Sequence, residues 1–325
     1  MAGKVKLGIT LYSLTREFIH YKLSLEDCIR TVAELGVDGV EIVGAQSVRG
    51  YPWPTDETIR SIRAMIDKYK LRLICYSGNA DRGMRSDKLD LSADELFEYV
   101  VNDIRFAKKL GAPVVRQQHN MTPRVMERVA PWAEKYKVKV TIEMHNPMSP
   151  TDPESMEFLR IFEKLKSPYI GFTPDFGSWA EKANPLHVAA LKQIVRKEVF
   201  DYVINAGEKN TPVEAVVQGL TKMGATPAEI ATVRSRYYFL ACRPADLDGL
   251  KRILPYSAHF HGKFHVLNDD GSDVAIPTGK LLSVLRDSGY DGYVSLEYEG
   301  HASVDTDAVP ILKRHLAYCR KALGT

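Results

Sequence analysis

Short hydrophobic runs alternate with longer amphipathic segments along most of the chain. Eight of the short runs combine β-branched residues with two-residue alternation, which is typical of buried strands. They lie at residues 4–12, 38–44, 71–78, 112–120, 138–146, 169–177, 257–266 and 292–300. Between them apolar residues recur at helical spacing, for example at 24–36, 55–70 and 92–110, and again after the last run at about 305–322. A strand followed by a helix is therefore predicted eight times.

This repeat predicts the fold class. Strands that alternate with helices and show no hairpin signal favour a parallel sheet, and eight such units favour a (β/α)8 TIM barrel. A doubly wound open sheet is the rival, but it calls for a glycine-rich phosphate loop after the first strand, and LYSLTREF at 11–18 has none. Local signals agree with the predicted elements, since Ser24 and Asp27 resemble a capping box and Gly36 is expected to end that helix.

One connection is much longer than a barrel needs. About 80 residues separate Phe176 from His259, and their apolar spacing is helical. We therefore predict a single barrel domain over 1–325 with a helical insertion at 180–255 between strands six and seven. The insertion either pads the exterior, covers the active site or docks a partner. A second long loop, NADRGMRSDKLDL at 79–91, is expected to cover the barrel mouth.

Polar residues gather where the later strands end, which is the end at which barrels of this kind carry their chemistry. Two-residue alternation places Glu143 and His145 on one face of the fifth predicted strand. The same rule places Glu297 and Glu299 on one face of the eighth, and Asp175 at the tip of the sixth. These side chains are expected to meet at one rim.

The seventh predicted strand contains AHFHGKFH at 258–265, in which polar and aromatic residues alternate. His259, His261, Lys263 and His265 share one face, and the phenylalanines between them share the other. His261 is at the height expected for the rim. His259 and His265 have either a structural role or a contact with substrate, and Glu299 either caps a helix or contacts substrate.

The charge at this rim favours a metal ion. Several carboxylates in one cleft repel one another, and partial dehydration adds to the cost unless a cation offsets their charge. The candidate ligands are Glu143, Asp175, His261 and Glu297. Carboxylate oxygens with one imidazole are suitable ligands for Mn²⁺, Mg²⁺ or Co²⁺, whereas structural zinc sites are typically rich in sulfur. Each of these residues alone has an ordinary structural explanation, as a helix cap or a hydrogen-bonded strand histidine.

Overall composition excludes several other classes of protein. The 325 residues are 45% hydrophobic and 26% charged with a net charge of +3, which gives no basic surface for nucleic acid. No apolar run approaches the ~20 residues of a membrane helix and no leader is apparent, so a cytoplasmic protein without membrane contact is expected. The four cysteines form no CxxC pair, and Cys75 is expected to be a small buried hydrophobe.

Five motifs together resemble the xylose-isomerase-like barrel superfamily of sugar isomerases, epimerases and dehydratases. They are VDGVEI (37–42), IEMHN (142–146), PDFG (174–177), HGK (261–263) and GYDGYVSLEYEG (289–300). The resemblance implies that Glu143, Asp175, His261 and Glu297 are metal ligands. Many members carry a histidine three residues after the strand-six aspartate, where this chain has Ser178. The paired-glutamate proton shuttle of the sugar epimerases is therefore in doubt here.

Within that superfamily, IEMHNPMSP, PDFGSWA, HFHGKF and the helical insertion are most similar to the α subunits of C-glycoside deglycosidases. This resemblance implies cleavage of the carbon–carbon bond between a 3-oxo-glucosyl unit and a flavonoid or anthraquinone aglycone. It also implies a complex with a small β subunit. Manganese is the expected metal, and deprotonation beside the ketone followed by β-elimination is the expected reaction.

His145 is the candidate general base in this mechanism, because imidazole commonly exchanges protons near neutral pH. Glu143 and Glu297 would take part as holders of the metal. Lys263, His259, Arg116 and Glu299 are candidate substrate contacts, although structural ion pairs are equally compatible with Lys263 and Arg116.

Three other functions are compatible with the same strands. A sugar isomerase or epimerase would use the metal site through an enediolate. A barrel endonuclease would need further ligands and a basic groove, and His119 is the one spare histidine in a suitable place. A barrel retained only as an assembly subunit would not need the Glu, Asp, His, Glu set.

Overall fold

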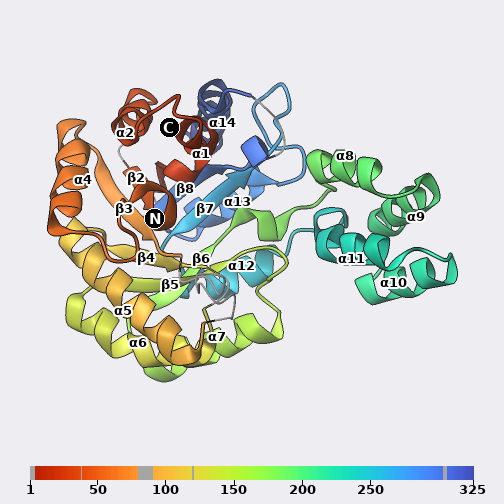
Figure 1. Ribbon diagram of the computed structural model, residues 1–325, viewed down its shortest axis with the longest axis horizontal. Helices are drawn as coiled ribbons and strands as arrows, with labels where there is room; N and C mark the ends of the chain where they lie inside the picture. Colours follow the sequence, from red (N-terminus) through yellow and green to blue (C-terminus); the bar gives the residue numbers. More distant parts are fainter. Residues whose placement is uncertain (1–3, 38, 80–90, 119–120, 303–305) are drawn as a thin grey trace.

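The computed structural model describes residues 4–37, 39–79, 91–118, 121–302 and 306–325. Eight parallel strands form a barrel surrounded by helices (Figure 1). Their bounds are β1 (Lys6–Thr10), β2 (Gly39–Val43), β3 (Arg72–Ser77), β4 (Val114–Gln117), β5 (Lys139–Met144), β6 (Ile170–Pro174), β7 (Phe260–Phe264) and β8 (Tyr293–Tyr298). Each observed strand lies within a predicted run, so the (β/α)8 barrel is confirmed.

The order of the strands around the sheet is β6-β5-β4-β3-β2-β1-β8-β7, in which every neighbour is also a sequence neighbour except β1 and β8. The ring is nearly closed between β6 and β7, where two isolated bridges pair Phe172 with Ser257 and Asp175 with His261. Gly171 makes this close approach possible, because a Cβ there would lie 2.2 Å from the carbonyl oxygen of Tyr256. The seam therefore places Asp175 directly beside His261.

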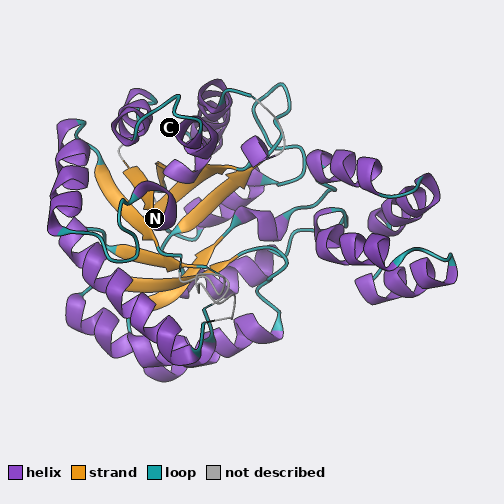
Figure 2. Ribbon diagram, in the orientation of Figure 1, coloured by secondary structure: helices purple, strands orange, loops and turns teal. Residues whose placement is uncertain are grey.

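Helices cover the outside of the barrel (Figure 2). The longer ones are α2 (Leu25–Glu34), α4 (Asp56–Lys68), α5 (Ala93–Leu110), α6 (Pro123–Tyr136), α7 (Pro153–Leu165), α13 (Thr278–Asp287) and α14 (Ala308–Leu323), with α1 (Thr15–Ile19), α3 (Gly44–Ser47) and α12 (Leu247–Ile253) shorter. Ser24 and Asp27 form the predicted capping box at the start of α2. No helix in the described ranges is both long enough and apolar enough to cross a bilayer.

Between β6 and β7 the chain forms a group of helices that extends away from the barrel, which we call the arm (residues 185–241; Figure 1). It consists of α8 (Pro185–Ile194), α9 (Lys197–Glu208), α10 (Val213–Lys222) and α11 (Pro227–Arg236), followed by a 3-10 turn. The arm has a hydrophobic core separate from that of the barrel. Its two ends meet where the amide of Asn184 donates a 2.8 Å hydrogen bond to the carbonyl of Phe239.

Candidate metal centre and active site

Four neighbouring strands bring the predicted ligands together inside the barrel. Glu143 lies on β5, Asp175 follows β6, His261 lies on β7 and Glu297 on β8. One ligand atom from each lies within 4.8 Å of all the others, and all four side chains are buried. The cluster expected from strand parity is thus present, in a geometry that could hold one ion.

The donor set fits a cation because its buried carboxylate oxygens already gather round a positive charge. Oδ2 of Asp175 and Oε2 of Glu297, both closed to solvent, lie 2.6 Å and 3.4 Å from the Lys263 ammonium. Burial raises the pKa of Glu297, and Asp175 and Glu143 add to the effect. For Glu143 the effect of burial is outweighed by Arg116 and His261, which lower its pKa. Crowded carboxyls of this kind are stabilised by a positive ion between them.

His261 is held from both sides of its ring. Its Nδ1 lies 2.7 Å from Oε1 of Glu143 and 3.5 Å from Oε1 of Glu297, while its Nε2 lies 3.0 Å from Oε1 of Glu41. Burial opposes the charged form, but Glu41, Glu297 and Glu143 raise the pKa of His261 well above its usual value. Nδ1 is therefore the nitrogen that faces the ligand cluster.

Lys263 reaches the same cluster from the next inward position on β7. Its ammonium lies 2.6 Å from Asp175, 3.0 Å from Glu299 and 3.4 Å from Glu297. Burial works against the charged amine, but these carboxylates raise the pKa of Lys263 well above its usual value. Lys263 is consequently a permanent cation that partly offsets the negative charge of the centre.

The hydrogen-bond partners of His145 indicate which of its ring nitrogens carries the hydrogen. Its Nδ1 lies 2.7 Å from the carbonyl oxygen of Asn146, which only accepts, so Nδ1 carries the hydrogen. Its Nε2 lies 2.9 Å from the Lys263 ammonium, which only donates, so Nε2 carries no hydrogen and its lone pair accepts this hydrogen bond. The His145 side chain is 24% exposed, more than any of the four ligands. The ring thus presents a basic nitrogen beside the centre.

A cavity of about 160 Å³ opens above the ligands. Its polar lining includes Arg116, His145, Lys263 and Glu299, together with Tyr12. Arg116 lies 3.6 Å from Glu143, and its Nε and Nη1 donate no hydrogen bond within the described structure. The cavity is smaller than the roughly 300–1,000 Å³ typical for drug-sized ligands, so it would enclose a small molecule or one end of a larger one.

Not every predicted site residue reaches this cavity. His259 is 1% exposed and its Nε2 lies 2.9 Å from Glu41, beneath the ligands, so its contact is structural. The Ser178 hydroxyl donates to the carbonyl of Met144 at 2.9 Å, so it is engaged with the backbone. Glu299 lines the cavity and pairs with Lys263 and His265. His119 and most of the 79–91 loop lie outside the described residues.

The residue that the sequence reasoning missed is Glu41 on β2. It is completely buried and contacts both His259 and His261. A signal was present, since a carboxylate interrupts the apolar run GVEIV and alternates with Val40 and Ile42. Its partners lie more than 200 positions away, which local periodicity does not reveal.

Comparison with known proteins agrees with this architecture. Residues 29–322 match the family model described as xylose isomerase-like TIM barrel. A solved structure of D-psicose 3-epimerase from Clostridium cellulolyticum H10 superposes with a TM-score of 0.59 at 14% identity, over 98% of this chain and 99% of that one. At that identity the likeness concerns the fold alone.

Two curated relatives are much more similar in sequence. The 3'-dehydrocarminate deglycosidase alpha subunit of a Microbacterium species is 35% identical over 314 residues, covering 91% of this chain and 88% of the relative. The C-glycoside deglycosidase alpha subunit of Microbacterium trichothecenolyticum is 33% identical, covering 90% and 83%. The chain belongs to the xylose isomerase-like TIM barrel family and, within it, to the relatives of the C-glycoside deglycosidase alpha subunits.

Proposed function

We propose that the protein is a metal-dependent C-glycoside deglycosidase, a carbon–carbon lyase acting on 3-oxo-C-glucosides. The names of the curated relatives support the class of substrate. The observation that carries the chemistry is the placement of His145, whose basic Nε2 lies beside the four-ligand cluster and lines the cavity. A flavonoid or related aromatic aglycone would extend beyond the cavity.

Glu143, Asp175, His261 and Glu297 would hold the metal ion, with Mn²⁺ proposed as the native ion and Mg²⁺ or Co²⁺ as substitutes. When bound, the ion would supply a Lewis acid for the ketone oxygen of the sugar and a neighbouring hydroxyl. Among the residues that the structure describes, five carboxylates, counting Glu41 and Glu299 with the ligands, share the centre with two permanent cations, Arg116 and Lys263. This excess of negative charge supports a divalent ion.

His145 would act as the general base. Its Nε2 takes the proton from the carbon between the ketone and the carbon that carries the aglycone. The electrons of that C–H bond form a carbon–carbon double bond in the sugar, and the bond to the aglycone breaks. The aglycone carbon keeps the bonding pair and takes up one proton, which His145 returns. The two products together have the composition of the substrate, so no water or oxidant is consumed.

Other cavity residues would position the sugar for this step. The N–H groups of Arg116 that donate no hydrogen bond within the described residues are suited to a ketone or hydroxyl oxygen. Lys263 donates to Nε2 of His145 and so fixes the ring with that nitrogen beside the ligand cluster. Glu299 accepts from Lys263 and lies 3.4 Å from the Tyr12 hydroxyl, which places it where sugar hydroxyls would donate.

A second subunit is part of the proposal. The relatives are named alpha subunits, and we propose that this chain also works with a partner, a small β subunit. The arm is the proposed contact, because it forms a separate helical unit whose base reaches the active site. Phe239, at that base, lies in a small pocket together with His145 and Lys263.

Loss of metal in ligand variants tests the centre. Glu143→Gln and Asp175→Asn should each leave the purified protein without Mn²⁺ in elemental analysis, because each removes an anionic ligand. Glu163→Gln, on the exposed surface of α7, is the matched control and should keep one ion per chain. Full occupancy in both ligand variants would show that these residues do not hold the ion.

A further inference from the structure

Glu41 accepts hydrogen bonds from three side chains beneath the metal centre. The donors are Nε2 of His259 at 2.9 Å, Nε2 of His261 at 3.0 Å, and the hydroxyl of Ser77. Both carboxylate oxygens are occupied as acceptors, since Oε1 faces Ser77 and His261 and Oε2 faces His259. Because a carboxylate oxygen accepts, the Nε2 atoms of both imidazoles carry hydrogens that point at Glu41.

This contact determines which nitrogen of His261 faces the ligands. With Nε2–H committed to Glu41, the plane of the ring is fixed and Nδ1 points at Glu143 and Glu297. The contact crosses the barrel from β2 to β7, two strands that are not neighbours in the sheet. It therefore ties the imidazole to a part of the barrel that carries none of the four ligands.

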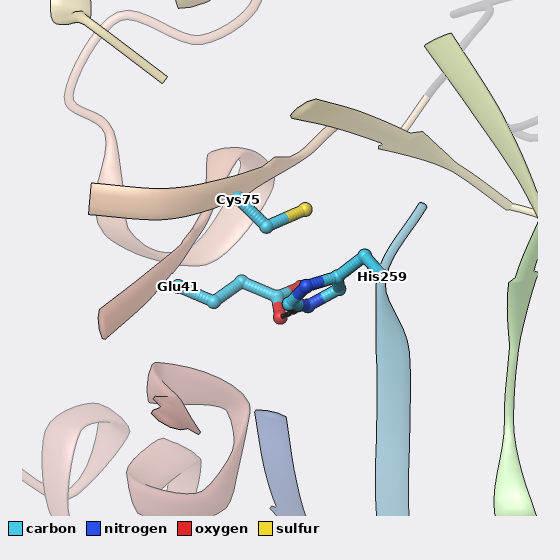
Figure 3. A group of neighbouring side chains, drawn as sticks. All are labelled: Glu41, Cys75 and His259. Carbon is cyan, nitrogen blue, oxygen red and sulfur yellow. Dashed lines mark hydrogen bonds and ion pairs between the residues drawn. The ribbon is translucent and has the colours of Figure 1, made fainter. Parts of the chain in front are cut away.

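Cys75 lies close to the same carboxylate, and Figure 3 shows Glu41, Cys75 and His259 gathered from three segments of the barrel wall. The three could form a second metal site of their own. However, both oxygens of Glu41 already accept hydrogen bonds, and burial raises the pKa of the Cys75 thiol well above its usual value. A protonated thiol is a poor metal ligand. A supporting role for Glu41 is the better explanation.

We propose that Glu41 is a positioning residue that orients His261 so that Nδ1 faces the metal, with His259 and Ser77 holding Glu41 in place. The inference rests on the metal centre proposed above. A carboxylate that accepts from the distal nitrogen of a ligand histidine restricts the ring and makes it a better donor to the ion. Loss of such a partner typically lowers metal affinity 10- to 100-fold.

The test measures Mn²⁺ affinity by the electron paramagnetic resonance signal of the free ion, using the full-length chain. Glu41→Ala should raise the dissociation constant roughly 10- to 100-fold with one ion still bound at saturation. Glu41→Gln should lose less, because its carbonyl still accepts from one donor. Asp103→Asn removes another buried carboxyl that does not contact His261, and it should leave the affinity unchanged.

A second readout does not depend on metal. In metal-free protein with ¹⁵N-labelled histidine, the Nε2–H resonance of His261, assigned by its loss in His261→Gln, should lie far downfield and move in Glu41→Ala. If wild-type protein binds no Mn²⁺, the metal centre is wrong and this resonance alone decides the role of Glu41. An unmoved resonance would overturn the inference. The inference would also be overturned if the wild-type chain bound two Mn²⁺ ions and Glu41→Ala and Cys75→Ser each bound only one. Glu41 would then be a ligand of the second ion.

Discussion

The ammonium nitrogen of Lys263 lies 2.6 Å from Oδ2 of Asp175, and both side chains are closed to solvent. A buried pair of this kind contributes little net stability, but removing one partner leaves an uncompensated charge that costs about 3–5 kcal/mol. The Lys263 ammonium and the proposed metal ion therefore act on the same carboxylates.

Lys263→Met should destabilise the metal-free protein by about 3–5 kcal/mol, because it leaves the charge of Asp175 uncompensated. Mn²⁺ should then restore more stability to the variant than it adds to the wild type, because a cation again offsets the charge of Asp175 and Glu297. Urea unfolding with EDTA and with Mn²⁺ measures both effects. Lys280→Met is the control, since Lys280 pairs with Glu181 on the surface and is 59% exposed. Equal gains from Mn²⁺ in wild type and Lys263→Met would contradict this explanation.

His145→Ala should keep Mn²⁺ but lose proton abstraction. The expected fall in turnover is on the order of 10²- to 10⁴-fold, the usual contribution of a general base. Deuterium exchange at the carbon next to the ketone, measured by mass spectrometry in D₂O, reports the proton step directly. His20→Ala, on the exposed surface, provides the matched control. Unchanged exchange in His145→Ala would remove His145 from the mechanism.

Strand parity predicts which polar side chains of the later strands lie together. Glu143, Asp175, His261 and Glu297 converge because alternation defines the inward face and the carboxyl ends of parallel strands share one rim. Parity does not define depth. His259 shares the face of His261 but comes two residues earlier, about 6.6 Å deeper in the barrel, so it contacts Glu41 and not the cavity.

Contacts between distant strands, such as those of Glu41, could not be predicted from the sequence either. Its inward position follows from the pattern of β2, but its role depends on contacts with His259 and His261 on the far side of the barrel. The shape of the arm could not be predicted from the sequence for a related reason. Helical spacing shows that helices are present, whereas their extension away from the barrel depends on how they pack on one another.

Stability should depend on pH through Asp103 on α5. Burial raises the pKa of this carboxyl to about 7, although Gln117 and Tyr76 donate to it. Between about pH 4 and pH 7 the folded chain keeps a proton that the unfolded chain loses, so stability falls as the pH rises through this range. At about 1.4 kcal/mol per pKa unit, the loss is on the order of 4 kcal/mol at most.

Asp103→Asn should remove this loss, because the amide oxygen still accepts and nothing ionises. In urea titrations, the free energy of unfolding of Asp103→Asn should rise relative to that of the wild type as the pH is raised from 4.5 to 8. Asp67→Asn, at an exposed position of α4, should show no such trend. A difference between Asp103→Asn and wild type that is constant with pH would contradict the assignment.

Removal of the arm should leave the barrel intact. The ends of the arm meet at Asn184 and Phe239, so residues 185–238 can be replaced by a short Gly-Ser linker. We expect cooperative unfolding and Mn²⁺ binding to persist while deglycosylation with the partner subunit is impaired. Val216→Asp, which places a charge in the core of the arm, should have the same effect. Full activity of the truncated chain would mean that the arm is only padding.

The proposed lyase activity is tested most directly by release of free aglycone from a 3-oxo-C-glucoside of a flavone, measured anaerobically with Mn²⁺, with and without the partner subunit. Release that requires Mn²⁺ and both chains, and that is lost in His145→Ala, is the predicted result. No release with both chains present, together with interconversion of simple ketoses, would contradict the account and identify a sugar isomerase or epimerase instead.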